Sequence, residues 1–289
     1  MGPGRRRAAC EGPSGLSAGE RSVVVTGASS GIGEACALRL RRAGWRVYGG
    51  VRDETGAARL RAAGVEPLPL EVTDAGQIAA AAEAVGPTLD ALVDNAGVAI
   101  ASPLELVPLD ELRHQLDVNV VGQVAVTQAF LPALRARRGR IVLMGSIGGR
   151  SALPFLGPYA ASKHALEAIA DSLRVELRPW GMDVSIVEPA SIATAIWQKG
   201  AARAEELSRG FDPESAALYA GRVARFREVA LSRGPGADAD EVAKAVEHAL
   251  TARRPRARYL VGRDAHLRAW IERLPTRLRD RLLARALTD

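Results

Sequence analysis

A glycine-rich loop between a buried strand and a helix constrains this chain more than any other feature. The segment SVVVTG over 22–27 is a short β-branched run, and a helical segment over 31–43 follows it. The loop between them reads TGASSGIG, with Gly27, Gly31 and Gly33. Glycine permits tight turns and close backbone approach to a ligand, and a helix N-terminus offers free N–H groups to an anion. The loop therefore predicts a pyrophosphate-binding turn, with a purely structural turn as the alternative, since its spacing is not GxGxxG.

Strands and helices alternate along the chain that follows. We expect strands at 22–27, 46–51, 65–72, 89–97, 139–146, 182–189 and 257–261, and helices at 31–43, 55–63, 75–85, 108–136, 157–179 and 238–251. Such alternation is typical of right-handed βαβ crossovers and of a parallel sheet covered on both faces. The sequence therefore predicts one doubly wound α/β domain of Rossmann type, with a mainly parallel seven-stranded sheet flanked by helices.

Three segments fall outside this alternation. Residues 1–20 are expected to form a flexible tail, which leaves 21–262 as the dinucleotide-binding catalytic domain. Residues 194–236 are polar and helical in propensity, and they follow the sixth strand, where a lid over a ligand would lie. An ordinary pair of surface helices is the alternative there. Residues 263–289 carry leucines at helical spacing, interrupted by Pro275, and predict a helical C-terminal extension.

Composition excludes several classes of protein. With 47% hydrophobic and 25% charged residues, the chain is neither disordered nor fibrous. Two cysteines, Cys10 and Cys36, are too few for a disulfide framework and indicate a reducing cytoplasm. The net charge of +6 comes from arginines spread over most of the chain, so we expect a solvated surface and no nucleic-acid partner. The longest uncharged run, 118–134, is too short for a usual membrane span, and no histidine lies at metal-ligand spacing.

A tyrosine and a lysine share one helical face. Tyr159 and Lys163 are four residues apart, so the phenol and the ammonium point the same way. Lowering a phenol pKa from about 10 to about 7 requires roughly 4 kcal/mol. A cation about 4 Å away supplies roughly that amount at an effective dielectric constant of about 20. The pair alone is common by chance, but Lys163 is one of only three lysines in a chain that otherwise uses arginine.

Three further polar positions end strands or interrupt an apolar helix. Ser146 ends the strand 139–146, where its hydroxyl can donate to a substrate carbonyl oxygen. The sequence DNAG over 94–97 ends the strand before the long helical stretch, and Asn119 is a lone amide within that stretch. Each of these features has little weight alone.

Taken together and in this order, the motifs resemble those of the short-chain dehydrogenase/reductase family, over about residues 22–262. The long 194–236 segment, the sequence GMDVSIVEPASIAT and the basic tail after ARYLVG resemble the hydroxysteroid and retinol dehydrogenase branch, which implies a bulky apolar substrate. The resemblance implies a catalytic tetrad of Asn119, Ser146, Tyr159 and Lys163. Ser146 would hold the substrate oxygen, Tyr159 would exchange the proton, Lys163 would lower the phenol pKa and bind the ribose, and Asn119 would hold a relay water. The resemblance and the loop together imply that the cofactor is bound by Gly27, Ser29, Ser30, Gly31, Ile32, Gly33, Arg52, Glu71, Val72, Asn95, Ala96, Gly97, Tyr159, Lys163, Pro189, Ala190, Ile192 and Thr194.

The chain departs from the family pattern at three of its positions. Ala190 replaces the glycine that usually follows Pro189, so its methyl group is expected to crowd the backbone near the nicotinamide. Glu71 replaces the usual aspartate near the adenine, and Asp94 stands where an asparagine is frequent.

The cofactor preference is read from the end of the second strand. Val51 provides no carboxylate for the ribose hydroxyls, and Arg52 can bind a 2′-phosphate with a charge-assisted fork. Ser29 and Ser30 can also donate to that phosphate, while Asp53 and Glu54 oppose it. The sequence predicts NADP(H) as the preferred cofactor, with NAD(H) possible.

We expect a cytoplasmic enzyme that interconverts an alcohol and a ketone or aldehyde, on a bulky apolar substrate. A cofactor-binding regulatory or scaffold protein with little turnover is the alternative function. A third interpretation is a protein bound to a membrane surface through the amphipathic tail. The helices at 108–136 and 157–179 are apolar on more than one face, which predicts a homodimer or homotetramer.

Overall fold

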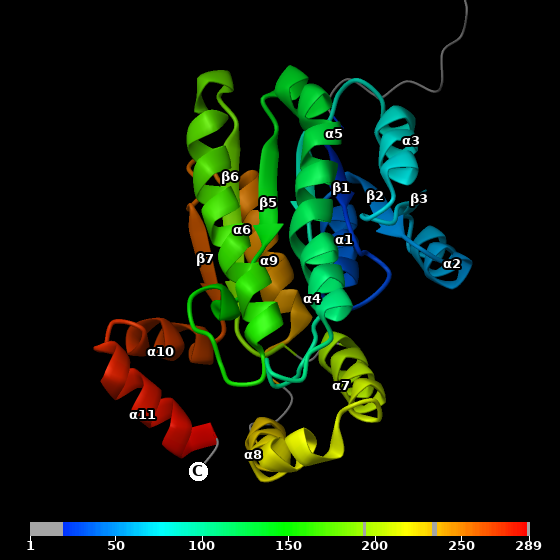
Figure 1. Ribbon diagram of the computed structural model, residues 1–289. Coiled ribbons are helices and arrows are strands. Elements are labelled where there is room, and N and C mark those ends of the chain that lie inside the picture. Colours follow the sequence, from blue (N-terminus) through cyan, green and yellow to red (C-terminus); the bar gives the residue numbers. More distant parts are fainter. Residues whose placement is uncertain (1–19, 193–194, 233–235, 288–289) are drawn as a thin grey trace, which may run out of the picture.

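A seven-stranded parallel sheet forms the centre of the computed structural model, which describes residues 20–192, 195–232 and 236–287 (Figure 1). The strand order is β3-β2-β1-β4-β5-β6-β7, and every pairing in it is parallel. The order reverses at β1, between β2 and β4, as a doubly wound sheet requires. The predicted fold class is confirmed. The strands are β1 (Ser22–Val25), β2 (Arg46–Val51), β3 (Glu66–Pro69), β4 (Ala91–Asp94), β5 (Arg140–Met144), β6 (Asp183–Pro189) and β7 (Arg258–Val261).

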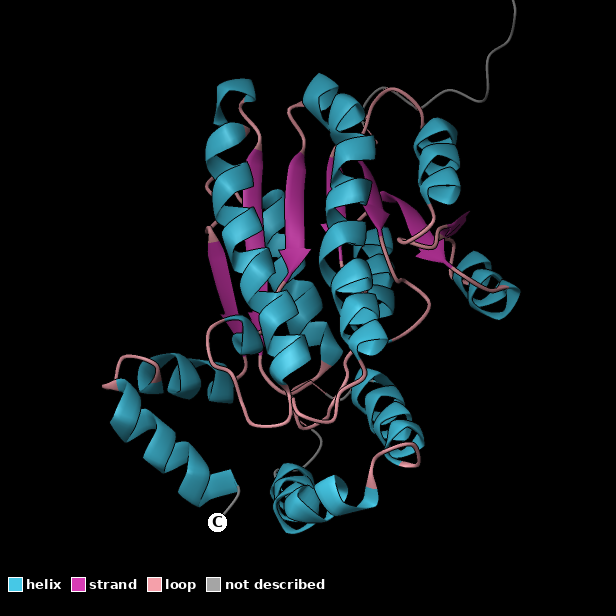
Figure 2. Ribbon diagram, in the orientation of Figure 1, coloured by secondary structure: helices cyan, strands magenta, loops and turns pink. Residues whose placement is uncertain are grey.

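Helices cover both faces of this sheet, in two layers (Figure 2). One face packs against α1 (Gly31–Arg42), α2 (Glu54–Ala62) and α9 (Ala239–Thr251). The other packs against α3 (Ala75–Val85), α5 (Gly122–Arg137) and α6 (Gly157–Glu176), and α4 (Leu109–Leu116) leads into α5. Successive side chains of β1 point to opposite faces of the sheet, so this strand contributes to both cores. Val23 and Val25 point to the first face and Val24 to the second.

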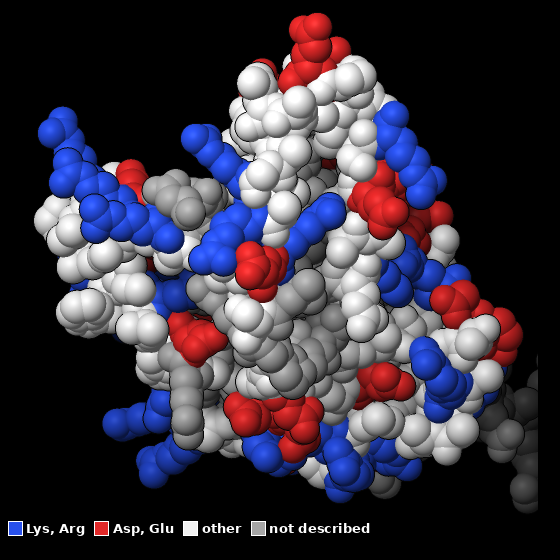
Figure 3. Space-filling view, turned by 90° about the horizontal axis from the view of Figure 1, so that it is seen from below, with Lys and Arg blue, Asp and Glu red and all other residues white. Residues whose placement is uncertain are grey.

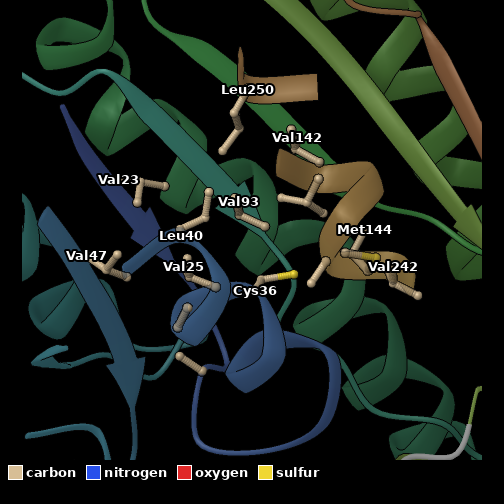
Figure 4. Packing of buried hydrophobic residues seen from close by; sticks show 14 of the residues in the cluster. Val23, Val25, Cys36, Leu40, Val47, Val93, Val142, Met144, Val242 and Leu250 are labelled. Atoms are coloured by element: carbon tan, nitrogen blue, oxygen red, sulfur yellow. The ribbon is translucent and has the colours of Figure 1, made fainter. Parts of the chain in front are cut away.

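The first of these cores surrounds a buried cysteine (Figure 4). Cys36 on α1 packs among Val25, Leu40 and Val242, and its thiol makes no disulfide. Burial raises the pKa of this thiol to about 12, so Cys36 is an inert core residue. Cys10 lies outside the described residues.

The helical stretch predicted over 108–136 is divided into three parts. A π-helix over Asp117–Val121 separates α4 from α5. A π-helix inserts one extra residue into a helical turn, and such insertions are frequent at functional sites. Hydrophobic periodicity alone did not reveal this π-helix, which contains Asn119.

Two helices from the 194–236 segment lie beyond the C-terminal ends of the strands (Figure 1). These are α7 (Ala195–Ser208) and α8 (Pro213–Ser232). An ion pair between Arg203 and Glu111 joins α7 to α4, and the Tyr219 hydroxyl on α8 donates to Glu105 at 2.5 Å. The segment is therefore anchored to the sheet domain, in the place predicted for a lid.

The C-terminal part forms α10 (Arg263–Ile271) and α11 (Thr276–Leu287), with Pro275 between them as expected. None of the helices in the described ranges is long and apolar enough to cross a membrane. The N-terminal segment 1–19, which the sequence predicts to be a flexible tail, lies outside the described residues. The domain boundaries at 20/21 and 262/263 stay predictions.

Candidate active site

A cavity of about 360 Å³ opens at the C-terminal ends of β1, β4, β5 and β6. This edge of a doubly wound sheet, next to the point where the strand order reverses, is where such folds bind ligands. Neither Gly33 nor Asn119 lines the cavity, and Thr194 lies outside the described residues. The other predicted site residues do line it: Gly27, Ser29, Ser30, Gly31, Ile32, Arg52, Glu71, Val72, Asn95, Ala96, Gly97, Ser146, Tyr159, Lys163, Pro189, Ala190 and Ile192.

The glycine loop has the shape that a pyrophosphate needs. Gly27 has a φ of 62°, and a Cβ at Gly33 would lie 2.2 Å from the Gly27 carbonyl oxygen. Only glycine allows α1 to begin so close to β1. Ser30 at the N-cap of α1 accepts no hydrogen bond from the helix through its side chain. The first N–H groups of α1 are therefore available to an anion, so the residues present fit a dinucleotide.

The corner predicted to hold a 2′-phosphate contains two arginines. Arg52 is exposed, and it contacts Glu71 at 3.3 Å between Nη1 and Oε2. Arg59 on α2 donates to the Ser29 carbonyl oxygen at 2.5 Å, which places a second guanidinium beside the glycine loop. Sequence reasoning missed Arg59, because the loop itself carries no basic residue. The short separation of Arg59 from Arg52 in the sequence, about two helical turns, was the available signal.

The two acidic residues that follow Arg52 are used elsewhere. Asp53 caps α2 by accepting a hydrogen bond from the Gly56 N–H at 2.7 Å. Glu54 pairs with Arg61 at 2.5 Å. Asp53 is thus held at the N-terminus of α2, and the charge of Glu54 is offset by Arg61, which reduces its opposition to an anion at Arg52.

The end of β4 is tied to β1 by an asparagine. Asn95 donates its Nδ2 to the Thr26 carbonyl oxygen at 2.9 Å, and its own N–H donates to Thr26 Oγ1 at 2.8 Å. Asp94, one residue earlier, is fully buried and accepts a hydrogen bond from Thr127 at 2.7 Å. Burial raises the pKa of Asp94 to about 7.

Ser146, Tyr159 and Lys163 meet at the inner wall of the cavity. Ser146 Oγ accepts a hydrogen bond from the Gly148 N–H at 3.0 Å, which holds the hydroxyl at the start of a 3₁₀ turn over Ile147–Gly149. The Lys163 ammonium donates to the Met144 carbonyl oxygen at 2.7 Å and lies 5.8 Å from the centroid of the Tyr159 ring. One strand end and one helix face thus bring a hydroxyl, a phenol and an ammonium together.

The pKa of the phenol differs in direction from the sequence expectation. Burial raises the pKa of Tyr159 above its ordinary value, while a hydrogen bond with Ser146 and the positive charge of Arg268 act against this rise. Burial also lowers the pKa of Lys163 to about 8, against the nearby charge of Glu167. The Lys163 ammonium therefore donates to the Met144 carbonyl oxygen. Desolvation is the largest influence on the pKa of Tyr159.

Asn119 is fully buried behind these residues. Its Oδ1 accepts from the Val98 N–H at 2.8 Å, and its Nδ2 donates to the Val98 carbonyl oxygen at 2.9 Å and to Ser162 Oγ at 3.0 Å. Both N–H groups of the amide are therefore occupied by the protein. The side chain therefore holds the segment after β4 in place. Because both amide N–H groups are used, the predicted relay water would have to bind to another group of Asn119.

The methyl group of Ala190 is accommodated by a glycine. A Cβ placed on Gly262 would lie 3.3 Å from the Ala190 Cβ, and Gly262 has a φ of 95°. Ala190 also donates its N–H to the Val261 carbonyl oxygen at 2.9 Å. The methyl group thus lies over Gly262, which leaves it room on that side, and crowding near the nicotinamide stays a prediction.

The open side of the cavity is lined by α7 and α4. Ile196 and Trp197 on α7 provide an apolar wall, and the Trp197 ring packs edge-to-face on Tyr159. Lys199 and His114 line the same side. Sequence reasoning missed Trp197 and Arg268, since neither belongs to a motif. In the part of the chain that the structure describes, no group of histidine, cysteine and acidic residues could hold a metal ion.

Fold and site together define a dinucleotide-binding oxidoreductase of the doubly wound α/β class. The model of the family described as short chain dehydrogenase matches residues 21–205. The chain belongs to the short-chain dehydrogenase/reductase family, and it is an oxidoreductase acting on CH–OH groups.

Curated relatives place the chain in the hydroxysteroid and retinol dehydrogenase branch. Human 17-beta-hydroxysteroid dehydrogenase type 1 is 38% identical over 251 residues, which cover 82% of this chain and 76% of that protein. Mouse retinol dehydrogenase 16 is 36% identical, with coverage of 91% and 88%. An NADPH-dependent 3-dehydrocapnine reductase from Ornithobacterium rhinotracheale is 34% identical, with coverage of 92% and 97%.

Solved structures agree with the assignment to the short-chain dehydrogenase/reductase family. A short-chain dehydrogenase from Streptomyces avermitilis has a TM-score of 0.75 and 30% identity, and the match covers 92% of this chain and 96% of that one. A short-chain dehydrogenase from Burkholderia cenocepacia J2315, solved in complex with NADP, has a TM-score of 0.71 and 28% identity, with coverage of 93% and 98%.

Proposed function

We propose that this protein is an NADP(H)-dependent enzyme that interconverts an alcohol and a ketone or aldehyde, with Tyr159 as the general acid and base. One observation carries the proposal: Ser146, Tyr159 and Lys163 line the same cavity as the glycine-rich loop. A hydroxyl donor, a proton-exchanging phenol and a cation beside a dinucleotide cradle suit hydride transfer at a carbonyl carbon.

The cofactor preference rests on the arginines beside the loop. Arg52 and Arg59 give the corner between β2 and the loop a positive charge that a 2′-phosphate would neutralise, and no carboxylate ends β2. A relative named as NADPH-dependent and a neighbour solved with NADP support this preference. NAD(H) remains possible, because Arg52 is partly neutralised by Glu71.

A bound nicotinamide dinucleotide would supply or accept the hydride. Ser146 donates a hydrogen bond to the substrate oxygen and thereby polarises the carbonyl group. Tyr159 gives its proton to that oxygen in the reduction and takes it back in the oxidation. Lys163, still mainly protonated at neutral pH because its pKa is about 8, stabilises the phenolate that each reduction leaves behind. Asn119 holds the segment after β4 in place.

We assign a bulky apolar substrate to the α7 side of the cavity. Ile100, Ile196 and Trp197 provide apolar contact area there. Two of the relatives are named as dehydrogenases of a hydroxysteroid and of retinol, which supports this assignment. His114 and Lys199 on the same side are basic, so substrates with an apolar body and a negatively charged end belong in any screen.

Association of the chain through α4, α5 and α6 is also part of the proposal. Val121, beside α5, is 59% exposed, and Val175 on α6 is 72% exposed, so apolar side chains remain on the outer faces of these helices. A homodimer or homotetramer would cover them. Sedimentation that shows only a monomer at micromolar concentration would contradict this part.

The experiment that tests the function is a spectrophotometric assay of NADPH and NADH oxidation with steroid, retinoid and aromatic ketones. We expect turnover with at least one bulky ketone and a preference for NADPH. Cofactor binding without turnover on any of these ketones or alcohols would favour the alternative, a regulatory or scaffold protein that binds the dinucleotide. Flotation with liposomes tests the separate interpretation that the basic tail binds a membrane surface.

A further inference from the structure

A cluster of charged residues lies behind the catalytic wall, away from the cofactor loop. Glu167 on α6 is one helical turn beyond Lys163, and Glu188 on β6 directly precedes Pro189. Arg150 follows the 3₁₀ turn that begins after Ser146, and Arg258 lies on β7. The side chain of Glu188 is completely buried, and that of Glu167 is 12% exposed. The cluster thus touches three segments that line the cavity.

Arginines satisfy only one oxygen of each carboxyl group. Arg150 Nη2 donates to Glu188 Oε1 at 2.8 Å, and Arg258 Nε donates to Glu167 Oε2 at 3.1 Å and lies 3.4 Å from Glu188 Oε1. The second oxygens, Glu167 Oε1 and Glu188 Oε2, are buried and have no donor among the described residues. Two carboxylate oxygens cannot bond to each other, because both only accept. A single proton between them makes one a donor and satisfies both.

We propose that Glu167 and Glu188 share one proton, and that this carboxyl pair is a positioning device that holds the Lys163 helix, the Ser146 turn and the Pro189 segment in register. Neither residue touches the cavity, so both act through their neighbours. A Cβ at Gly149 would lie 3.2 Å from Glu167 Cγ and 2.8 Å from the Lys163 carbonyl oxygen, which shows how closely the turn packs on this part of α6. The kinetic part of this inference rests on the proposed function, whereas the shared proton does not.

The raised pKa of Glu167 agrees with the geometry. Burial and the neighbouring Glu188 raise the pKa of Glu167 to about 7, while Arg258 acts against the rise. The other charges that face the pair are Lys163 and Asp171 on α6 and Arg150 after the 3₁₀ turn, and Asp171 accepts from Arg258 at 2.8 Å. Asp171 also accepts from Arg174 at 2.8 Å, so it has its own cation, and the second oxygens of Glu167 and Glu188 still lack a donor. Loss of the shared proton above neutral pH adds negative charge beside Lys163 and raises its pKa.

The test uses two kinds of substitution at the same positions. Glu167→Gln and Glu188→Gln replace the shared proton by a permanent amide donor, so they preserve the contact at every pH. Glu167→Ala and Glu188→Ala remove it. Glu176→Gln, an exposed carboxyl on the same helix, is the matched control. Thermal melts establish that each variant folds.

The first readout is an infrared titration of the cofactor-free protein, which needs no activity. We expect the band of a protonated carboxyl to disappear as the pH rises through neutrality in the wild type and in Glu176→Gln, and to be absent from both single glutamine variants. Asp94 also titrates near neutral pH, so the spectra are recorded in an Asp94→Asn background. No titrating band in that background, or the same band in the glutamine variants, would overturn the shared proton.

The second readout separates kcat from KM on the ketone that the screen identifies. We expect the alanine variants to lose about 10- to 100-fold in kcat with little change in KM, as misplacement of catalytic groups does. The glutamine variants should keep kcat within about threefold of the wild type. They should also lose the fall in kcat above neutral pH that loss of the shared proton causes in the wild type. Glutamine variants as impaired as the alanine variants, or alanine variants with normal kcat, would overturn the positioning role. A wild type without turnover would count against the proposed function alone, since the infrared result still decides the pair.

Discussion

Trp197 on α7 packs edge-to-face against Tyr159 on α6, with ring centroids 5.4 Å apart and ring planes at 64°. This contact joins the segment over the cavity to the phenol that we propose as acid and base. It also helps to bury the phenol, and burial is the largest cause of the raised pKa of Tyr159. The position of α7 and the proton affinity of Tyr159 are therefore linked. Seen from this end of the molecule, acidic and basic side chains are interspersed over the surface (Figure 3).

Removal of the phenol hydroxyl tests the catalytic assignment. Tyr159→Phe keeps the ring contact with Trp197 but loses the proton donor, so kcat should fall by roughly 10²–10⁴-fold. The dissociation constant for NADPH, measured by fluorescence titration, should change little. Turnover near the wild-type rate would show that another group transfers the proton.

The aromatic wall tests the substrate class. An aromatic contact with the substrate is worth about 0.5–1.5 kcal/mol beyond its buried area, so Trp197→Ala should raise KM for bulky aromatic ketones by about two- to tenfold. Small ketones, which leave the α7 side unfilled, should be affected less. Trp180→Ala is the control, because Trp180 stacks with Arg135 away from the cavity. Equal effects on large and small ketones would argue against substrate contact at Trp197.

The arginine that follows β2 tests the cofactor preference. Loss of one charge-assisted hydrogen bond costs about 1.5–3 kcal/mol, so Arg52→Ala should weaken NADPH binding by roughly ten- to a hundredfold and leave NADH nearly unchanged. Glu71→Gln should have the opposite effect on NADPH, because it releases Arg52 from its 3.3 Å contact. Titration calorimetry measures both. Equal losses for the two cofactors in Arg52→Ala, or a wild type that prefers NADH, would overturn the assignment.

A charge on the C-terminal extension tests the pKa of the phenol. The guanidinium of Arg268 lowers the pKa of Tyr159, so Arg268→Met should raise it further. Oxidation of an alcohol needs the phenolate, so its half-maximal rate should move to higher pH. Arg273→Met, an exposed change on the same extension, should leave the profile in place. An unchanged pH–rate profile in Arg268→Met would show that the charge of Arg268 does not affect the catalytic phenol.

The buried carboxyl at the end of β4 predicts a pH-dependent stability. Asp94 has a pKa of about 7 in the folded protein, above the ordinary value of an aspartate side chain. Its relative contribution to stability is therefore fully present below about pH 4 and is lost as the pH rises through 7. Asp94→Asn removes this dependence. The free energy of unfolding of the variant, relative to that of the wild type, should therefore be higher at pH 8 than at pH 5 by on the order of 2–4 kcal/mol. Denaturant titrations at the two pH values measure it, and parallel changes would contradict the buried proton.

Much of the fold follows from local patterns. The β-branched run at β1, the glycines after it and the helical spacing of α1 specify a strand-turn-helix unit whatever surrounds it, because backbone conformation and hydrophobic periodicity are local properties. The relation between Tyr159 and Lys163 is local for the same reason, since one helical turn separates them. The placement of Ser146 at a strand end was equally visible.

Other parts of the site depend on which segments the sheet brings together. No motif marks Arg59 beside Ser29 or Arg268 near Tyr159, and the Glu167–Glu188 pair joins a helix to a strand in the crossover that follows it. The direction of the pKa shift at Tyr159 also depended on packing, because desolvation is set by everything that covers the ring. Local sequence patterns specify the order of elements and the types of groups available for chemistry. Which charges lie close enough to act on one another follows from the tertiary arrangement, since Coulombic and desolvation energies depend on distance in space and on burial.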